Sequence, residues 1–246
     1  MMMRWLIDAP ADGIHNMACD EALLERVGRG ASPPTLRFYR WDPPTISLGY
    51  FQRFEDYASL AEPAGKLAVV RRQTGGGAIL HDLELTYSLV LPLSHPLLNT
   101  NGGANQLYHH VHDVFAALLN EHGVPVTRGP AHVSGCSHTG PFFCFERHCA
   151  FDLLAEGKKL MGSAQRRTTG AVLQHGSLIL DSRFGQQPCA TVATYAHIDI
   201  DAHAQRLVES IAHEPVGDPV PLDRDERDEA QQLREKYASR EWTAKR

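Results

Sequence analysis

The sequence predicts an α+β protein built on a mixed, largely antiparallel sheet flanked by helices. Strand-like and helix-like segments are intermingled, and few of them follow the strict strand–helix–strand order of parallel sheets. With 246 residues, 43% of them apolar, the chain can bury a substantial core in one large domain. We expect residues 1–215 to form the main domain and residues 216–246 to add a C-terminal helix that packs on it.

Short strands dominate the first half of the chain. Apolar or alternating side chains between turn signals predict five of them, at residues 6–8, 35–39, 45–48, 66–70 and 86–91. The Pro43-Pro44 break separates the second strand from the third. Between the first two strands, apolar side chains from Met17 to Val27 lie on or near one stripe, which predicts a helix over residues 15–27.

The second half contains the longer helices. Apolar residues recur at helical spacing over residues 105–122 and predict a helix there. Three strands are predicted next, at residues 150–154, 159–164 and 171–180. Two helices follow, at residues 201–213 and 223–237. An aspartate cap at Asp201 begins the first, and a capping box of Asp223 and Glu226 begins the second. Residues 130–143 have no period and are rich in Gly, Ser, His and Pro, which indicates a mobile loop beside a site.

Composition limits the classes of partner. The net charge of −5 gives no electrostatic footprint for nucleic acid, although a locally basic pocket is compatible with it. No apolar run approaches the roughly eighteen residues that a membrane span needs. The N-terminal apolar stretch is too short for a signal peptide. Five cysteines, an odd number, favour a reducing cytosol over a disulfide framework. We therefore expect a cytoplasmic protein without nucleic-acid or membrane partners.

A glycine-rich stretch, residues 71–82, is the strongest candidate for a ligand loop. It reads RRQTGGGAILHD and lies between two strand-like runs. Because glycine lacks a Cβ, such a loop can bring backbone N–H groups close to a ligand. The two arginines supply fixed positive charge for a carboxylate or phosphate. A loose turn between strands is the alternative interpretation.

Two adjacent lysines, Lys158 and Lys159, begin a later predicted strand. Successive side chains in a strand point to opposite faces, so one lysine faces inward if the other faces water. An inward lysine in a partly apolar strand can hydrogen-bond a carbonyl and stabilise negative charge that develops on it. The alternative is a pair of solvated charges that protects an edge strand from aggregation.

Several motifs together resemble the biotin/lipoate protein ligase family, in its lipoate branch. They are the glycine loop, GKKLMGSAQR at 157–166, QHGSL at 174–178, and N-terminal pieces at 16–24, 34–41 and 46–52. The resemblance covers most of residues 5–182. It implies a catalytic domain in which the glycine loop and the lysine strand line a tunnel for a medium-length acyl chain. It selects Lys159 to reach the acyl carbonyl and implies these substrate-binding residues: Arg72, Thr74, Gly75, Gly76, Gly77, His81, Gly162, Ser163, Ala164, His175 and Gly176.

Two chemistries share this family fold. Ligases activate lipoate with ATP and Mg²⁺ as lipoyl-AMP, whereas transferases take an octanoyl group from acyl carrier protein onto a cysteine. Cys144-Phe145, with Cys144 fifteen residues before Lys159, resembles the Bacillus-type octanoyltransferase branch. The resemblance therefore implies a cofactor-free transferase with Cys144 and Lys159 as catalytic residues. The acceptor would be a lysine of a lipoyl domain or of glycine-cleavage H protein.

Alternatives to this assignment stay open from the sequence. The chain could be an ATP-dependent lipoate–protein ligase that needs ATP and Mg²⁺, or a non-catalytic paralogue that binds lipoyl domains. An octanoyl donor and a lipoyl donor are not distinguished. Cys149 could replace Cys144 as the nucleophile, and Cys144 could be an inert buried thiol. Cys19 and Cys189 lie away from the motifs and are expected to be unreactive.

Histidines and cysteines crowd the region before the lysine strand, but their spacing does not form Cys-x-x-Cys pairs, so no metal site is predicted. These residues are His132, Cys136, His138, Cys144, His148 and Cys149.

The remaining polar candidates have two interpretations each. His81 and His175 are possible general bases or satisfied structural histidines. Arg166 and Arg167 could contact a phosphate or an acidic partner, or could lie on a solvated strand end. A solvated helix face is expected for His109, His110 and His112.

Overall fold

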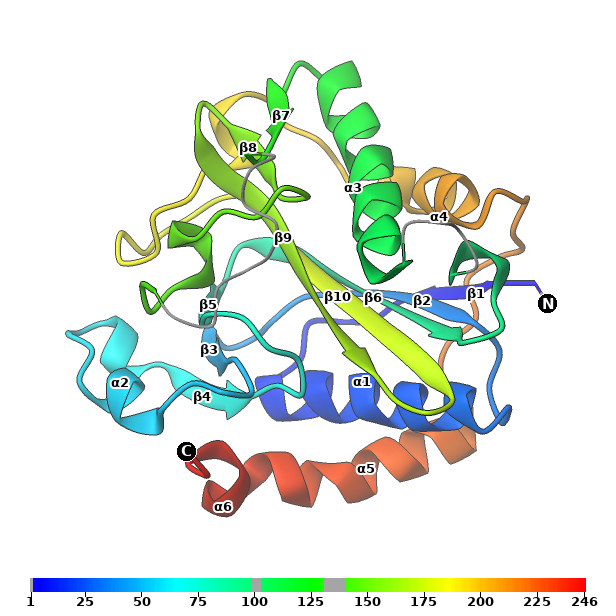
Figure 1. Ribbon diagram of the computed structural model, residues 1–246, viewed down its shortest axis with the longest axis horizontal. Coiled ribbons are helices and arrows are strands. Elements are labelled where there is room, and N and C mark those ends of the chain that lie inside the picture. The colour runs from blue at the N-terminus through cyan, green and yellow to red at the C-terminus, as the bar shows by residue number, and fades with distance from the viewer. Residues whose placement is uncertain (1, 99–102, 131–139) are drawn as a thin grey trace.

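The computed structural model describes residues 2–98, 103–130 and 140–246 of the chain. It confirms the predicted α+β class, because a seven-stranded sheet lies between helices and a three-stranded sheet adjoins it (Figure 1). Within these described ranges, no helix combines the length and apolar character needed to cross a bilayer.

The large sheet is almost entirely antiparallel, in the order β1-β2-β6-β10-β9-β8-β7. Only β1 and β2 pair in parallel. Its strands are β1 (Arg4–Ile7), β2 (Thr35–Tyr39), β6 (Glu84–Pro92), β7 (Val126–Arg128), β8 (Leu153–Ala155), β9 (Lys158–Arg167) and β10 (Ala171–Ile179). The long central strands β6, β9 and β10 form the wall on which the site described below is built.

The small sheet holds both ends of the glycine loop. Its order is β4-β3-β5, with β3 (Thr45–Leu48) parallel to β4 (Ala68–Arg71) and antiparallel to β5 (Ile79–His81). The loop leaves β4 and enters β5, so both of its ends are fixed to β3. The sequence analysis missed β5 because three residues are too few to show a period.

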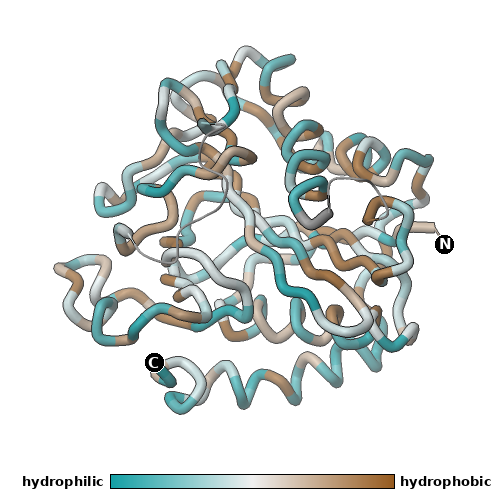
Figure 2. The backbone as a smooth tube through the Cα atoms, in the orientation of Figure 1, coloured by the Kyte–Doolittle hydropathy of each residue, from teal (hydrophilic) through white to brown (hydrophobic). Residues whose placement is uncertain are grey.

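Helices cover both faces of the large sheet. α1 (Gly13–Gly28) packs on one face through Leu23 and Val27, which contact Val90 and Leu173 in a shared core. α3 (Gly103–Glu121) and α4 (Ala204–Ala212) cover the other face. Figure 2 shows the apolar character concentrated along the central strands and the helix faces that meet them.

The last long helix lies against the outside of α1 (Figure 1). α5 (Arg224–Ala238) packs there, opened by the predicted capping box of Asp223 and Glu226. α6 (Arg240–Thr243) then reaches the base of the glycine loop, where Arg71 donates two hydrogen bonds to the Thr243 carbonyl. One further short helix, α2 (Phe54–Ala58), follows β3.

Some predicted boundaries are wrong. α4 begins at Ala204 with His203 as a cap that makes no side-chain bond, and Asp201 pairs instead with Arg40. β8 is shorter than predicted because a turn, closed by a 3.0 Å bond from the Asp152 N–H to the Cys149 carbonyl, occupies its first residues. Most of the loop predicted at 130–143 lies outside the described residues.

Candidate active site

Arg72 organises the glycine loop from within. Its guanidinium donates to the Ser47 carbonyl and hydroxyl, to the Thr74 hydroxyl, and to the carbonyls of Gly75 and Gly77, at 2.7–3.1 Å. These five bonds use all five of its N–H donors. Burial lowers the pKa of Arg72 to about 10. The side chain therefore shapes the loop and has no donor left for a ligand.

The loop in turn holds the backbone of Cys144. The Ala78 N–H donates to the Phe142 carbonyl at 2.9 Å, and the Cys144 N–H donates to the Ala78 carbonyl at 2.7 Å. A Cβ at Gly77 would lie 2.9 Å from the Cys144 nitrogen and 3.0 Å from its Cα. Only glycine allows this approach. The third glycine thus serves to position the cysteine.

Lys159 and Cys144 meet at this point. The Lys159 Nζ lies 3.6 Å from the Cys144 Sγ and 3.4 Å from its carbonyl oxygen. Lys159 is 1% exposed, and its ammonium forms a 2.8 Å ion pair with Asp152. Burial alone would lower the pKa of Lys159, but the neighbouring Cys144 and Asp152 outweigh it and raise the pKa above its usual value. A charged ammonium therefore lies beside the sulfur.

Asp152 supports the lysine from behind. It is completely buried, and its Oδ2 accepts the Cys149 N–H at 2.7 Å as well as bonding Lys159. Burial raises the pKa of Asp152, against the opposing effect of the Lys159 ammonium. The sequence analysis missed this residue, since a single aspartate in the middle of a predicted strand gives no signal about its partner.

Gly162 makes room for the lysine on its own strand. A Cβ there would overlap the Lys159 Cε and lie 2.8 Å from its Nζ. Gly176, on the paired strand β10, similarly leaves space for the Ser163 hydroxyl and the Tyr87 ring. Two predicted glycines are therefore explained by close packing of functional side chains.

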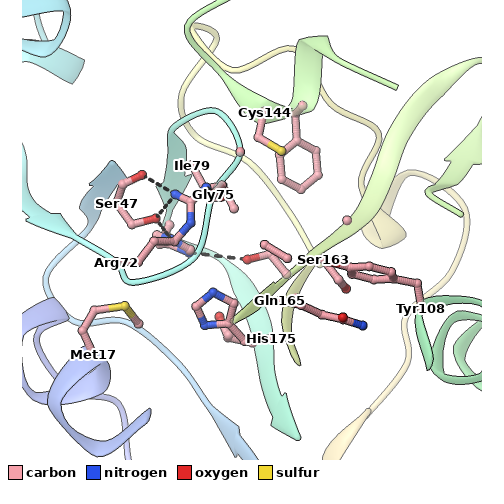
Figure 3. A pocket seen from close by; sticks show the side chains of 18 of the residues that line it. Met17, Ser47, Arg72, Gly75, Ile79, Tyr108, Cys144, Ser163, Gln165 and His175 are labelled. Carbon is pink, nitrogen blue, oxygen red and sulfur yellow. Dashed lines mark hydrogen bonds between the residues drawn. The ribbon is translucent and has the colours of Figure 1, made fainter. Parts of the chain in front are cut away.

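A pocket of about 230 Å³ opens beside these groups. In Figure 3, Cys144 lies at one side of it, and Met17 and His175 lie at the other. Large apolar and aromatic side chains supply much of its wall: Met17, Tyr39, Trp41, Ile79, Tyr108, Phe145 and Phe151. A narrow, mostly apolar cavity with a few polar groups suits an acyl chain with one reactive end.

Most of the predicted site residues line this pocket. They are Arg72, Gly75, Gly76, His81, Cys144, Gly162, Ser163, Ala164, His175 and Gly176. Three others act from behind the lining: Thr74 bonds His175, Gly77 contacts Cys144, and Lys159 reaches the sulfur. The motifs separated by a hundred residues thus converge on one cavity.

Both predicted histidines are held by a carboxylate on one side and a hydroxyl on the other. The His175 Nδ1 lies 2.9 Å from Asp20 and its Nε2 2.7 Å from the Thr74 hydroxyl. The His81 Nδ1 lies 2.7 Å from Glu84 and its Nε2 2.8 Å from Ser47. Burial lowers the pKa of His81. Both ring nitrogens of each are engaged, which favours the structural interpretation over a general base.

The position of His112 contradicts the expectation that it lies on a solvated helix face. It is completely buried rather than solvated, with Nδ1 2.5 Å from the Phe151 carbonyl and Nε2 2.6 Å from the Ser163 hydroxyl. Burial lowers its pKa to about 3, so the ring is neutral. Its Nδ1–H donates to Phe151 and its Nε2 accepts from Ser163. His112 lies seven residues, or about two helical turns, before the buried Leu119, and this spacing puts it near the buried stripe of the helix. The sequence analysis did not use this signal.

A family model described as the lipoyl protein ligase A/B catalytic domain matches residues 12–218. The chain belongs to this family. Among curated relatives, the octanoyltransferase LipM of Moorella thermoacetica is 35% identical, over 99% of this chain and 98% of that protein. The same enzyme of Kyrpidia tusciae is also 35% identical, over 92% and 93%. That of Symbiobacterium thermophilum is 43% identical over 69% of this chain and 62% of the relative.

Solved structures share the lipoyl ligase fold. A candidate lipoate protein ligase from T. acidophilum superposes with a TM-score of 0.79 at 25% identity, over 100% of both chains. A lipoate-protein ligase A bound with ATP gives a TM-score of 0.77 at 24% identity, over 99% of both chains. The second likeness shows the fold alone.

The cysteines of this lipoyl ligase family member differ in burial and in whether their thiols are free. Cys149 is fully buried and disulfide-bonded, so it offers no thiol and is wrong as the alternative nucleophile. The disulfide also contradicts the expectation from the sequence that the cysteines are reduced. Cys19 and Cys189 are free, and burial raises the pKa of both. Among the described cysteines, only Cys144 is a free thiol in the pocket.

The metal alternative receives no support from the described part of the chain, where no group of three or more His, Cys, Asp or Glu side chains is placed to hold an ion. His132, Cys136 and His138 lie outside the described residues. Arg166 and Arg167, at the end of β9, are both exposed, and Arg166 lies over the Tyr50 ring.

Proposed function

We propose that this chain transfers an octanoyl group in protein lipoylation through a thioester on Cys144. The enzymatic family and the full-length likeness to octanoyltransferases support the reaction class. The observation that carries the mechanism is the 3.6 Å distance between the Lys159 Nζ and the Cys144 Sγ beside a mostly apolar pocket. The octanoyl chain would occupy that pocket.

In the first step the Cys144 thiolate attacks the thioester carbonyl of octanoyl-acyl carrier protein. A new carbon–sulfur bond forms, the bond to the carrier sulfur breaks, and the carrier thiolate takes up a proton from solvent. The Lys159 ammonium stabilises negative charge on the attacking sulfur and on the carbonyl oxygen. Asp152 keeps that ammonium in place.

In the second step a neutral lysine amine of the acceptor attacks the acyl-Cys144 carbonyl. A carbon–nitrogen bond forms, the carbon–sulfur bond breaks, Cys144 leaves as the thiolate that began the first step, and the proton lost by the amine passes to solvent. One difficult transfer between two proteins is thereby divided into two easier ones. The acceptor is a lipoyl domain or glycine-cleavage H protein, and the reaction takes place in the cytoplasm.

The transferase needs no cofactor, whereas a lipoate–protein ligase would need ATP and Mg²⁺. An ATP-bound ligase has the same fold, so the ligase reaction is the second candidate function. Against it, Arg72 donates all five of its N–H groups to the chain itself and has none left for a nucleotide phosphate. Arg71, which is also buried, donates to main-chain carbonyls, among them those of Gly49 and Thr243.

The two functions differ in what the acceptor protein requires to become acylated. The purified chain is incubated with a lipoyl domain and either octanoyl-acyl carrier protein without ATP or lipoate with ATP and Mg²⁺. The acceptor mass then reports acylation. We expect labelling from the carrier donor alone, and we expect Cys144→Ser to abolish it.

Cys189→Ser is the matched control, because Cys189 is a free thiol outside the pocket lining. It should label the acceptor at the wild-type rate. Strong ATP-dependent labelling that persists in Cys144→Ser would show that the chain is a ligase instead.

A further inference from the structure

Three cations gather around aromatic rings where the C-terminal residues meet the glycine loop. The Lys245 Nζ lies 3.5 Å from the centroid of the Tyr50 ring and 3.3 Å from that of Trp242. The guanidinium of Arg246 lies 5.6 Å, and that of Arg166 5.8 Å, from the Tyr50 ring. We call Arg166, Lys245 and Arg246 the rim cations.

No acidic side chain among the described residues pairs with the rim cations. None of them forms a salt bridge among the described residues, although the chain as a whole carries 29 acidic side chains and a net charge of −5. The Lys245 Nζ is buried and makes no hydrogen bond. Burial, followed by the charges of Arg71, Lys236, Arg246 and Arg166, lowers the pKa of Lys245 to about 8. Ring faces attract a cation, but they do not neutralise it. Three cationic side chains therefore share this place with no acidic side chain of the described residues to balance them.

The rim cations adjoin the pocket. Gly75 lines the pocket, and a Cβ on it would lie 3.9 Å from the Phe51 ring, over which Arg246 lies at 5.3 Å. Arg166 follows Gln165, another lining residue. Two residues after Gly75, Gly77 contacts the backbone of Cys144. One loop thus joins the rim cations to the reacting sulfur, and an extended ligand lying along it would contact both.

We propose that the rim cations bind the phosphate of the prosthetic arm on which the carrier protein delivers the acyl group. This inference rests on the proposed function. A carrier presents its acyl thioester at the end of a pantetheine arm that is joined to the protein through a phosphodiester. The arm places one anionic group some way behind the thioester, as the rim cations lie beside the glycine loop, whose Gly77 contacts the backbone of Cys144. Arginine and lysine are the side chains that proteins use for phosphate.

The test compares donors that differ only in the phosphate. Acylation of Cys144 by octanoyl-pantetheine and by octanoyl-phosphopantetheine is followed by intact mass, and kcat/KM is obtained for each. We expect the wild type to prefer the phosphorylated donor by roughly tenfold or more. Lys245→Gln should lose most of that preference, and Arg166→Gln should weaken it.

Arg167→Gln is the matched control, because it removes the same charge one residue away on the opposite face of β9. It should keep the wild-type preference. Equal use of both donors by the wild type would overturn the inference. So would a Lys245→Gln variant that slows both donors by the same factor, because that result would indicate a structural role.

A binding measurement separates this inference from the proposed reaction. Cys144→Ala protein is titrated calorimetrically with phosphopantetheine, pantetheine and AMP. We expect phosphopantetheine to bind more tightly than pantetheine, and Lys245→Gln to remove the difference. If this holds while no donor acylates the wild type, the proposed function is wrong and the phosphate site stands. Preferential binding of AMP would assign the site to a nucleotide and would refute the carrier-arm inference.

Discussion

At the scale of single residues, the account depends on one buried ammonium and what surrounds it. Lys159 has Asp152 at 2.8 Å and the Cys144 sulfur at 3.6 Å, with almost no exposure to water. A buried charge that loses its partner is strongly destabilising. Asp152 is therefore required both for the fold near β8 and for the position of Lys159.

Removing the charge of Asp152 tests this arrangement. We expect Asp152→Asn to lower the free energy of unfolding by about 3–5 kcal/mol, because Lys159 becomes an unpaired buried charge. Displacement of the ammonium should also slow acylation of Cys144 by roughly 10²-fold in kcat, with a smaller change in KM. Chemical denaturation and single-turnover kinetics measure the two effects.

Lys158→Gln provides the comparison, since Lys158 is exposed on the same strand. It should change neither quantity appreciably. An Asp152→Asn protein with wild-type kcat would remove Asp152 from the mechanism and leave it a purely structural residue.

The sequence alone suggested Cys144 and Lys159 as the proposed reacting pair, but it did not reveal the residues that hold them in place. Cys144 and Lys159 follow from motif resemblance, and strand alternation points one of the two lysines inward if the other faces water. Asp152 and His112 could not be found this way, because their roles depend on partners that only folding brings near: Lys159 across a β-bulge for Asp152, and Ser163 of β9 beneath α3 for His112. Cys149 could be excluded as a nucleophile only from its disulfide.

At the scale of elements, the packing of β9 leaves room for one long side chain, that of Lys159. Gly162 leaves the space that the Lys159 chain occupies. Gly162→Ala should force Lys159 away from Cys144, lowering stability by about 1–3 kcal/mol and slowing acylation. The backbone angles at Gly162 suit any residue, so the effect should come from the clash alone.

Gly185→Ala is the control for this substitution, since no atom lies within 4 Å of the added methyl group. Thermal unfolding and the acylation rate should separate the two variants. If Gly162→Ala acylates as fast as Gly185→Ala, the tight packing of Lys159 has no bearing on the reaction.

The helix α3 contributes a pH-sensitive contact through His112. The ring stays neutral in the folded protein down to about pH 3, whereas in the unfolded chain it binds a proton near pH 6.5. The unfolded state therefore binds more protons between these values, and stability falls as pH drops through 6.5. From pH 7.5 to 5 this residue alone should remove about 2 kcal/mol.

Denaturation of the wild type and of His112→Gln across that range isolates the contribution. The variant should be less stable at pH 7.5 but should lose less stability on acidification. His197→Gln, at an exposed position, should follow the wild-type curve. A wild-type slope in His112→Gln would mean that other groups account for the pH dependence.

At the scale of the whole molecule, the C-terminal helix closes the fold onto β1. The Glu226 carboxylate at the start of α5 accepts from Arg4 of β1 at 2.7 and 2.8 Å and from Ser32 at 2.6 Å. Burial opposes the charge of Glu226, but Arg4 and Ser32 outweigh it and hold its pKa below the usual value. We expect Glu226→Gln to cost about 2–3 kcal/mol of stability.

This loss should leave acylation of Cys144 intact at low temperature, because Glu226 makes no contact with the pocket lining. Asp228→Asn, which disrupts an exposed pair on the same helix, should cost almost nothing. Equal midpoints in urea for the two variants would show that the Arg4–Glu226 contact does not fasten α5.

The fold class was predictable because long segments such as α3 and β10 show their hydrophobic period in the sequence. Short elements such as α2, α6 and β5 did not, since three to five residues carry no period and their conformation is imposed by tertiary contacts. Strand order was equally hidden, because hydrophobic pattern gives the faces of a strand but not its neighbours.

The central claim is that Cys144 carries the acyl group, and intact mass after mixing with octanoyl-acyl carrier protein tests it most directly. We predict a gain of one octanoyl group on the wild-type chain without ATP, mapped by peptide analysis to Cys144 and absent from Cys144→Ala. An adduct that forms equally well on Cys144→Ala, or no adduct on the wild type while the acceptor becomes octanoylated, would contradict it.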